Sequence, residues 1–137
     1  MKSTVYNAVL AKLSLAPVAR ATDEAFNGTA VDRSEFKNYA RTVGVVVTTG
    51  AVTDGTHVIT LETSENNSDW AAADASYIQG SLPTLTSTSD NVVLEFGYTG
   101  PGRYLRVVST ASGTTSGGIY SALILLGDVR REPVARA

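Results

Sequence analysis

The fold is decided by residues 42–64, TVGVVVTTGAVTDGTHVITLETS. Val43 and Val45 alternate with Thr and Gly on one side of the turn, and Ile59 and Leu61 alternate with polar residues on the other. Alternation with a period of two places side chains on opposite faces of a strand, so each half is predicted to be a half-buried β-strand. Asp-Gly between two such strands is a strong signal for a hairpin turn. The stretch therefore predicts antiparallel β-structure.

The pattern recurs at short intervals along most of the chain. Glycine, proline, aspartate and asparagine separate the segments, as they do in turns. About six to eight short strands with no helices between them are typical of an antiparallel β-sandwich or barrel and exclude a parallel α/β sheet. The predicted strands include Phe36–Thr49, Val58–Ser64, Asn91–Tyr98, Arg103–Ser109 and Ile119–Leu126.

The first residues have a different periodicity. Val5, Val9, Leu10 and Leu13 would share one face of a short helix, which Pro17 would end. This segment is either a capping helix or extended arm packed on its own domain, or an arm that docks on a partner chain. An apolar stripe this short is compatible with both alternatives.

The last residues lack an apolar pattern and contain Arg130 and Arg131. They form a candidate extension beyond the core. We therefore expect an N-terminal arm (residues 1–20), a single β-sandwich domain (residues 21–128) and a C-terminal tail (residues 129–137).

The composition excludes several classes of function. The chain has 137 residues, no cysteine, one histidine and a formal net charge of −2. Thiolate chemistry and Cys-ligated metals are therefore ruled out, and we expect no metal and no cofactor. No overall positive field attracts nucleic acid or anionic lipid, and no apolar run is long enough to cross a bilayer, so neither nucleic acid nor a membrane is an expected partner.

The ionisable residues do not form a recognisable catalytic set. His57 is in phase with the apolar face of its strand, which favours a structural role. No G-x-S-x-G motif accompanies it. Glu62 and Glu95 lie on predicted outward faces, where carboxylates usually meet solvent. The sequence therefore predicts that the chain is not an enzyme.

Two other side chains are candidates for binding. Trp70 follows the polar loop 65–69 and is the aromatic residue most suited to stacking on a sugar, although a plug over one end of the sandwich is also typical of such a residue. Arg103 and Arg106 fall on opposite faces of one predicted strand, so one of them should point toward a packed face, a sheet edge or a neighbouring subunit.

Several segments resemble small head proteins of tailed bacteriophages. They are Gly28-Thr29-Ala30-Val31-Asp32 before Phe36, Leu61-Glu62-Thr63-Ser64-Glu65-Asn66-Asn67-Ser68 with Trp70, Tyr104-Leu105-Arg106-Val107-Val108, Thr114-Thr115-Ser116-Gly117-Gly118, Tyr120-Ser121-Ala122-Leu123-Ile124-Leu125-Leu126-Gly127-Asp128 and Pro133-Val134-Ala135. The resemblance covers nearly the whole chain and identifies it as similar to capsid decoration (cement) proteins of jelly-roll type.

The resemblance implies a jelly-roll sandwich that binds the outside of an assembled capsid and bridges neighbouring capsomers. The implied partners are the major capsid protein and further copies of the chain, and the implied location is the capsid exterior of a virion made in the host bacterial cytoplasm. A carbohydrate-binding β-sandwich module and a tail or neck component are the alternatives. The candidate interface residues are Val5, Val9, Leu10, Leu13, Arg106, Arg130 and Arg131, with Trp70 as the candidate glycan contact.

Overall fold

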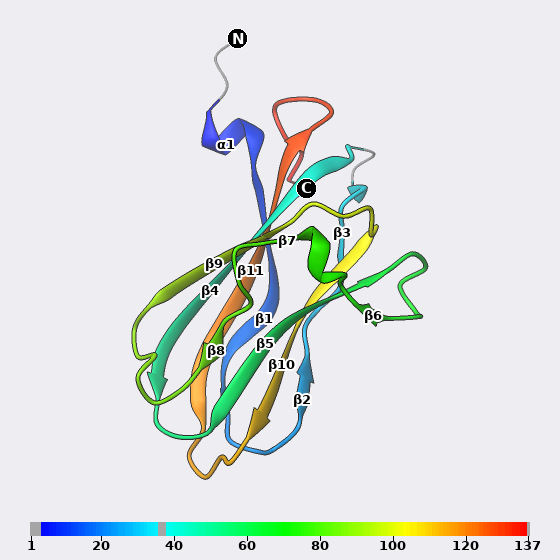
Figure 1. Cartoon of the computed structure of the whole chain (residues 1–137). Coiled ribbons are helices and arrows are strands. Elements are labelled where there is room, and N and C mark those ends of the chain that lie inside the picture. Colours follow the sequence, from blue (N-terminus) through cyan, green and yellow to red (C-terminus); the bar gives the residue numbers. More distant parts are fainter. Residues whose placement is uncertain (1–3, 36–37, 137) are drawn as a thin grey trace.

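The computed structural model describes residues 4–35 and 38–136, and almost every element in them is a β-strand (Figure 1). The elements are α1 (Val5–Ala8), β1 (Leu10–Arg20), β2 (Ala25–Asn27), β3 (Val31–Asp32), β4 (Ala40–Val52), β5 (Thr56–Ser64), β6 (Ala71–Ala72), the 3₁₀ helix η2 (Ala75–Tyr77), β7 (Ile78–Gln79), β8 (Thr84–Leu85), β9 (Val93–Tyr98), β10 (Tyr104–Ser112) and β11 (Gly118–Val129). Within the described residues, no helix has both the length and the apolar character needed to cross a bilayer.

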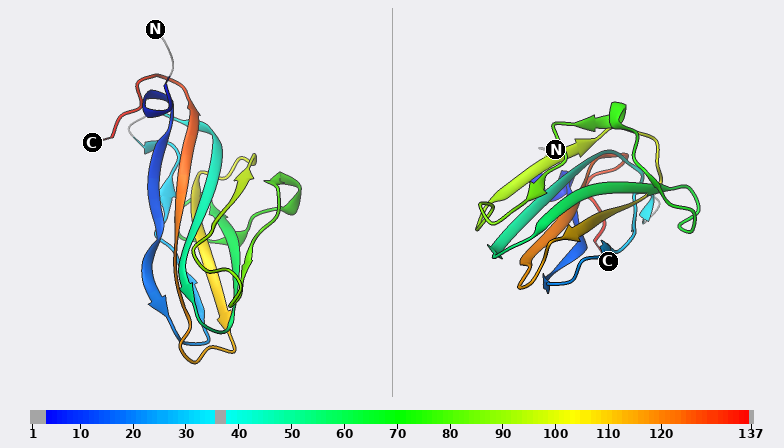
Figure 2. Two further views of the ribbon diagram at one scale, coloured as in Figure 1. Left: turned by 90° about the vertical axis from the view of Figure 1, so that its left-hand side faces the viewer. Right: turned by 60° about the horizontal axis from the view of Figure 1, so that its bottom comes forward.

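The strands form two sheets packed face to face (Figure 2). Sheet A has the order β1-β11-β4-β9-β7, and sheet B has the order β2-β10-β5-β6, with β3 paired to β10 and β8 paired to β5. All of these pairs are antiparallel. The first and last long strands are neighbours, and the chain crosses repeatedly between the sheets, which is the arrangement of a jelly roll. The predicted jelly-roll-like antiparallel sandwich is confirmed.

The predicted alternation places the core between the sheets. Val43, Val45 and Val47 of β4 are buried, and so are the inward residues of the strands around it. On β9, Glu95 is exposed whereas Phe96 and Tyr98 are buried, as their alternation predicts. Residues 36 and 37, with which the predicted first long strand begins, lie outside the described residues.

The Asp-Gly turn does not close a hairpin. Its flanking strands β4 and β5 lie in different sheets, so Asp54 and Gly55 bridge the two layers. Gly55 has φ +85°, which a glycine adopts without strain. The Asp54 carboxylate accepts hydrogen bonds from the backbone N–H groups of Thr115 (2.9 Å), Ser116 (3.0 Å) and Gly117 (2.8 Å). These residues lie in the connection from β10 of sheet B to β11 of sheet A. The carboxylate therefore joins this connection to the one between β4 and β5.

The N-terminal segment differs from the expected arm. Within residues 4–20, which the structure describes, Val5–Ala8 alone is helical, and Leu10–Arg20 is the edge strand of sheet A, paired with β11. Pairing of eight β1 residues with β11 outweighs the weak helical tendency of a short stripe. Pro17 lies inside the strand, beside a register shift at the free edge, where a missing N–H is tolerated. The boundary expected at residue 20 therefore does not separate an arm from the sandwich.

The C-terminal segment also differs from a free extension. Strand β11 continues to Val129, and the chain then folds back so that Val134 is buried. The N–H of Val134 donates to the carbonyl of Asn7 (2.8 Å), and the side chain of Asn38 bonds both the carbonyl and the N–H of Arg131 (2.9 Å each). These hydrogen bonds fasten the tail to the domain. They could not be predicted from the alternation of apolar and polar residues in the sequence.

Two arginines are buried, and their side chains donate hydrogen bonds to backbone carbonyls. The Arg33 side chain donates to the carbonyls of Ala40 (2.9 Å), Gly100 (2.8 Å), Gly102 (2.9 Å) and Arg41 (2.8 Å). In β1, the Arg20 side chain donates to the carbonyls of Ala16, Val18 and Tyr120. An arginine supplies five N–H donors in a fixed fork, which suits carbonyls that strand pairing leaves open.

Replacing Arg33 by methionine should lower the free energy of unfolding by about 3 kcal/mol, because several buried carbonyls lose a charged donor. The measurement is urea denaturation followed by circular dichroism. The control is Arg41→Met, since the Arg41 side chain is more than half exposed and its ion pair with Asp128 is long (3.7 Å); it should change stability by less than about 0.5 kcal/mol. Equal effects of the two variants would contradict this role for Arg33.

Asp54→Asn should destabilise the fold at neutral pH but not in acid. The N–H groups of Thr115, Ser116 and Gly117 hold the pKa of the Asp54 carboxyl below its ordinary value of 3.8. Because the folded pKa is lowered, its stabilisation is complete above the unfolded pKa and is lost as the pH falls through the folded one. Thermal midpoints of wild type and variant should therefore differ at pH 7 and converge as the pH falls through the folded pKa of Asp54. The control is Asp128→Asn, an exposed carboxylate in a long ion pair (3.7 Å), which should lower the thermal midpoint at pH 7 by less than Asp54→Asn does.

Candidate functional site

The two ends of the described chain meet at one end of the sandwich (Figure 2). The Arg136 guanidinium lies 3.8 Å from the centre of the Tyr6 ring and donates to the carbonyls of Tyr6 and Val9. Together with the bond from Val134 to Asn7, these contacts fasten the tail against α1. We call α1 with residues 129–136 the terminal end. The side chains of Val5 and Tyr6 are 81% and 70% exposed there.

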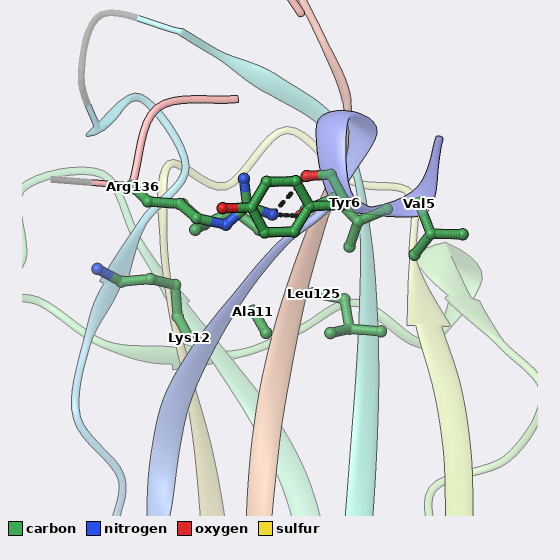
Figure 3. Close-up of a pocket in the computed structure, with 8 residues that line it drawn as sticks. Val5, Tyr6, Ala11, Lys12, Leu125 and Arg136 are labelled. Atoms are coloured by element: carbon green, nitrogen blue, oxygen red, sulfur yellow. Dashed lines mark hydrogen bonds between the residues drawn. The ribbon is translucent and has the colours of Figure 1, made fainter. Parts of the chain in front are cut away.

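An open groove lies beside α1 on sheet A (Figure 3). It has a volume of about 640 Å³, and Ala11 and Leu125 are among its lining residues. Lys12 and Arg136 bring two cations to the groove; Lys12 is already paired with Glu35 (2.8 Å). The groove therefore suits an apolar side chain with a polar or negative neighbour.

The outer face of sheet A is largely apolar. Leu13, Val93 and Ile119 are 48%, 61% and 44% exposed, and Leu123 lies half-buried between the first two in the sheet. The pairing register places outward side chains in three rows across the strands. The rows are Ala11–Leu125–Gly44–Gly97, Leu13–Leu123–Val46–Glu95 and Ser121–Thr48–Val93. Glu95 is the one ionisable side chain in these rows.

The outer face of sheet B is polar. The Arg106 guanidinium pairs with Glu62 (2.6 Å) and lies 4.4 Å from the centre of the Trp70 ring. Arg103, just before β10, pairs with Asp32 (3.1 Å) and is not in the core, so neither arginine points inward. One face of the Trp70 indole is thus covered by a cation, which leaves one face at most for stacking on a sugar.

His57 is fully buried and has a structural environment. Its Nδ1 lies 3.0 Å from the Tyr120 hydroxyl, and its Nε2 lies 3.2 Å from the carbonyl of Asp54. The Tyr120 hydroxyl also bonds that of Ser109, and burial raises the Tyr120 pKa. This network links sheet A to sheet B. Among the described residues, no three His, Asp or Glu side chains gather in a group that could hold a metal ion.

The structure separates the predicted interface residues into four environments. Val5 and Val9 are at the terminal end, Leu13 is on the outer face of sheet A, and Leu10 is 8% exposed and belongs to the core. Arg106 lies on the opposite sheet. The remaining two, Arg130 and Arg131, are exposed at the terminal end.

Sequence reasoning did not single out Tyr6, Arg136, Leu123 or Leu125. The run Ala122–Leu126 is apolar at every position, which is typical of a strand buried on both faces. In such a run, outward apolar residues cannot be distinguished from inward ones by sequence pattern. For Tyr6 and Arg136, no signal in the sequence brings the two ends of the chain together.

No protein-family model and no curated protein sequence matches this chain. One solved structure with a similar fold is the SPBc2 prophage-derived protein YomS, at 8% identity and a TM-score of 0.46 over 91% of this chain and 99% of that one. A second is the C-terminal family 22 carbohydrate-binding module of Clostridium thermocellum Xyn10B, at 13% identity and a TM-score of 0.39 over 98% of this chain and 91% of that one. A third is the N-terminal cellulose-binding domain of Cellulomonas fimi β-1,4-glucanase C, at 16% identity and a TM-score of 0.35 over 94% of this chain and 81% of that one. At these identities and TM-scores, the likenesses carry no implication for function.

Arg106→Ala should increase acrylamide quenching of Trp70 fluorescence by about half or more, because the guanidinium covers one face of the ring. The chain has a single tryptophan, so its intrinsic fluorescence reports on this residue alone. The control is Arg103→Ala, whose guanidinium lies over Tyr104 instead (4.9 Å). Unchanged quenching in Arg106→Ala would show that Trp70 is already open on both faces.

Proposed function

We propose that this chain is a structural protein of a tailed-bacteriophage virion that binds the outer capsid surface and stabilises it by bridging capsomers. The proposal rests on one observation above all. The two segments predicted from sequence as candidate contacts, the first residues and the last, lie together at the terminal end. The sequence resemblance to decoration proteins is the reason for proposing a bacteriophage capsid as the binding partner.

The terminal end has the chemistry of a protein-docking surface. Val5 and Tyr6 expose most of their side chains, and Arg130 is exposed in the tail that Val134 and Arg136 fasten to α1. Tyrosine and arginine are enriched among the residues that dominate protein interfaces, since both combine apolar area with directional hydrogen bonds. Apolar burial by Val5 and Tyr6 and pairing of Arg130 with capsid carboxylates would hold the contact.

The proposed partners are the major capsid protein and other copies of the chain. A formal net charge of −2 limits nonspecific attraction to other polyanions, including nucleic acid. On a symmetric lattice each weak contact recurs many times, and linked contacts gain effective concentration without any new interaction. A protein with this role works through shape and copy number.

The test is cosedimentation of the purified protein with mature capsids that lack it. Wild-type protein should bind, and the double variant Val5→Glu/Arg130→Glu should bind at least about tenfold more weakly, because an apolar contact and an ion pair are both lost. The matched control is Ser87→Glu, an exposed position in the loop at the opposite end of the sandwich, which should bind like wild type. Failure of the wild type to associate with capsids would overturn the proposal.

Two further measurements separate the alternatives. Capsids carrying the protein should withstand higher temperature than capsids without it, and cryo-electron microscopy should place its density on the outside of the head. Density in the tail or neck would replace the capsid proposal by that location. Glycan-array binding that disappears in Trp70→Ala would instead support a carbohydrate-binding module.

A further inference from the structure

The outer face of sheet A is unusual for a surface that stays in water. The three rows described above contain leucine, valine, alanine, glycine, serine and threonine, and one carboxylate at the β9 side. None of the described helices and strands crosses these rows in the view that faces β1, β11 and β4 (Figure 2, left). A continuous apolar patch of this kind marks a contact surface, because isolated soluble domains rarely expose one.

The size of the face matches what a stable pair of chains needs. Four strands that each occupy a width of about 4.8 Å cover about 19 Å, and the nine residues 42–50 of β4 occupy a length of about 30 Å. The projected area is therefore about 570 Å², and the accessible area of a corrugated face is larger. A standard interface buries about 800 Å² on each partner, which this face approaches before any contribution from α1.

Large and small side chains alternate between two adjacent rows of the face. The first row contains Ala11 on β1 and Gly44 on β4, and a Cβ added at Gly44 would meet only Leu125, at ordinary van der Waals distance. The next row contains Leu13 on β1 and Val46 on β4. The face therefore has depressions beside projections on the same two strands. This is the relief that lets packed sheets interdigitate about 10 Å apart.

We propose that two copies of this chain pack through the outer faces of their sheets A, about a two-fold axis that runs across the strands between these two rows. Such an axis lays each strand over its own counterpart in reverse direction. Leu13 and Val46 of each copy then lie over Ala11 and Gly44 of the other, and Leu123 of each lies over Leu125 of the other. The face is self-complementary, which a two-fold contact requires.

A second copy fits this face better than a partner of different chemistry. Interfaces between permanent identical partners resemble a divided protein core, with few charges at their centre. The ionisable Glu95 is on β9, the last of the four strands that the rows cross, and lies to one side of Leu13, Leu123 and Val46. The ion pairs Arg106–Glu62 and Arg103–Asp32 are instead associated with sheet B, which remains outside the proposed contact.

The first test is the mass of the purified protein by light scattering and sedimentation velocity, with no capsid present. Wild type should have twice the mass of 14.3 kDa. Leu123→Lys should raise the dissociation constant at least about a hundredfold, because two lysines per pair would be buried without partners. The control is Val58→Lys, which places the same charge on a 39% exposed strand position of sheet B and should leave the mass unchanged.

The second test is cross-linking, which does not depend on a disruptive substitution. The chain has no cysteine, so Leu123→Cys introduces a single thiol. A short bismaleimide should join two Leu123→Cys chains efficiently and should not join Val58→Cys chains. A monomeric wild type, a mass of three copies, an association unaffected by Leu123→Lys, or equal cross-linking of both cysteine variants would each overturn the two-fold contact. None of these measurements involves capsids, so their failure is distinct from failure of the proposed function.

Discussion

The arrangement of the terminal end depends on the hydrogen bonds of one buried guanidinium. Where the chain passes from one sheet of a jelly roll to the other, some backbone carbonyls have no partner in a strand ladder. Arg33 donates to the carbonyls of Ala40, Arg41, Gly100 and Gly102. Its backbone also pairs with Arg103 and Ala40. The start of β4 and the turn before β10 are thereby joined. Asn38, just before β4, bonds the tail at Arg131, so the position of the terminal end follows from this junction.

The core was predictable because its signal is local. Alternation at Val43 and Val45, and at Phe96 and Tyr98, reflects the pleat of a strand, which holds whatever the strand pairs with. The Asp54–Gly55 turn was placed correctly but connects two sheets, because a turn motif specifies local backbone geometry and not the partner of each strand. Strand β1 was missed because spacing over a few residues cannot report pairing with β11, about a hundred residues away.

The candidate site was less predictable than the core for a related reason. Burial of Arg33 and Arg20 depends on carbonyls that other segments bring to them, and a sequence does not show where unpaired carbonyls will gather. The outward residues Leu123 and Leu125 of β11, which belong to adjacent rows, were hidden because their inward neighbours are equally apolar. His57 was recognisable as structural, since its phase with Ile59 and Leu61 already placed it in the core.

The two sheets differ in chemistry, and the difference organises both proposals. Sheet B directs Arg106, Glu62 and Trp70 outward, groups that stay hydrated and paired in an isolated chain. Sheet A directs Leu13 and Val93 outward, which gain free energy only when covered. A two-fold axis across the strands of sheet A covers that face and turns the two terminal ends in opposite directions. In the proposed assembly each pair therefore carries one docking end at either tip, and bridging of capsomers follows from the geometry of the pair without a second type of contact on the single chain.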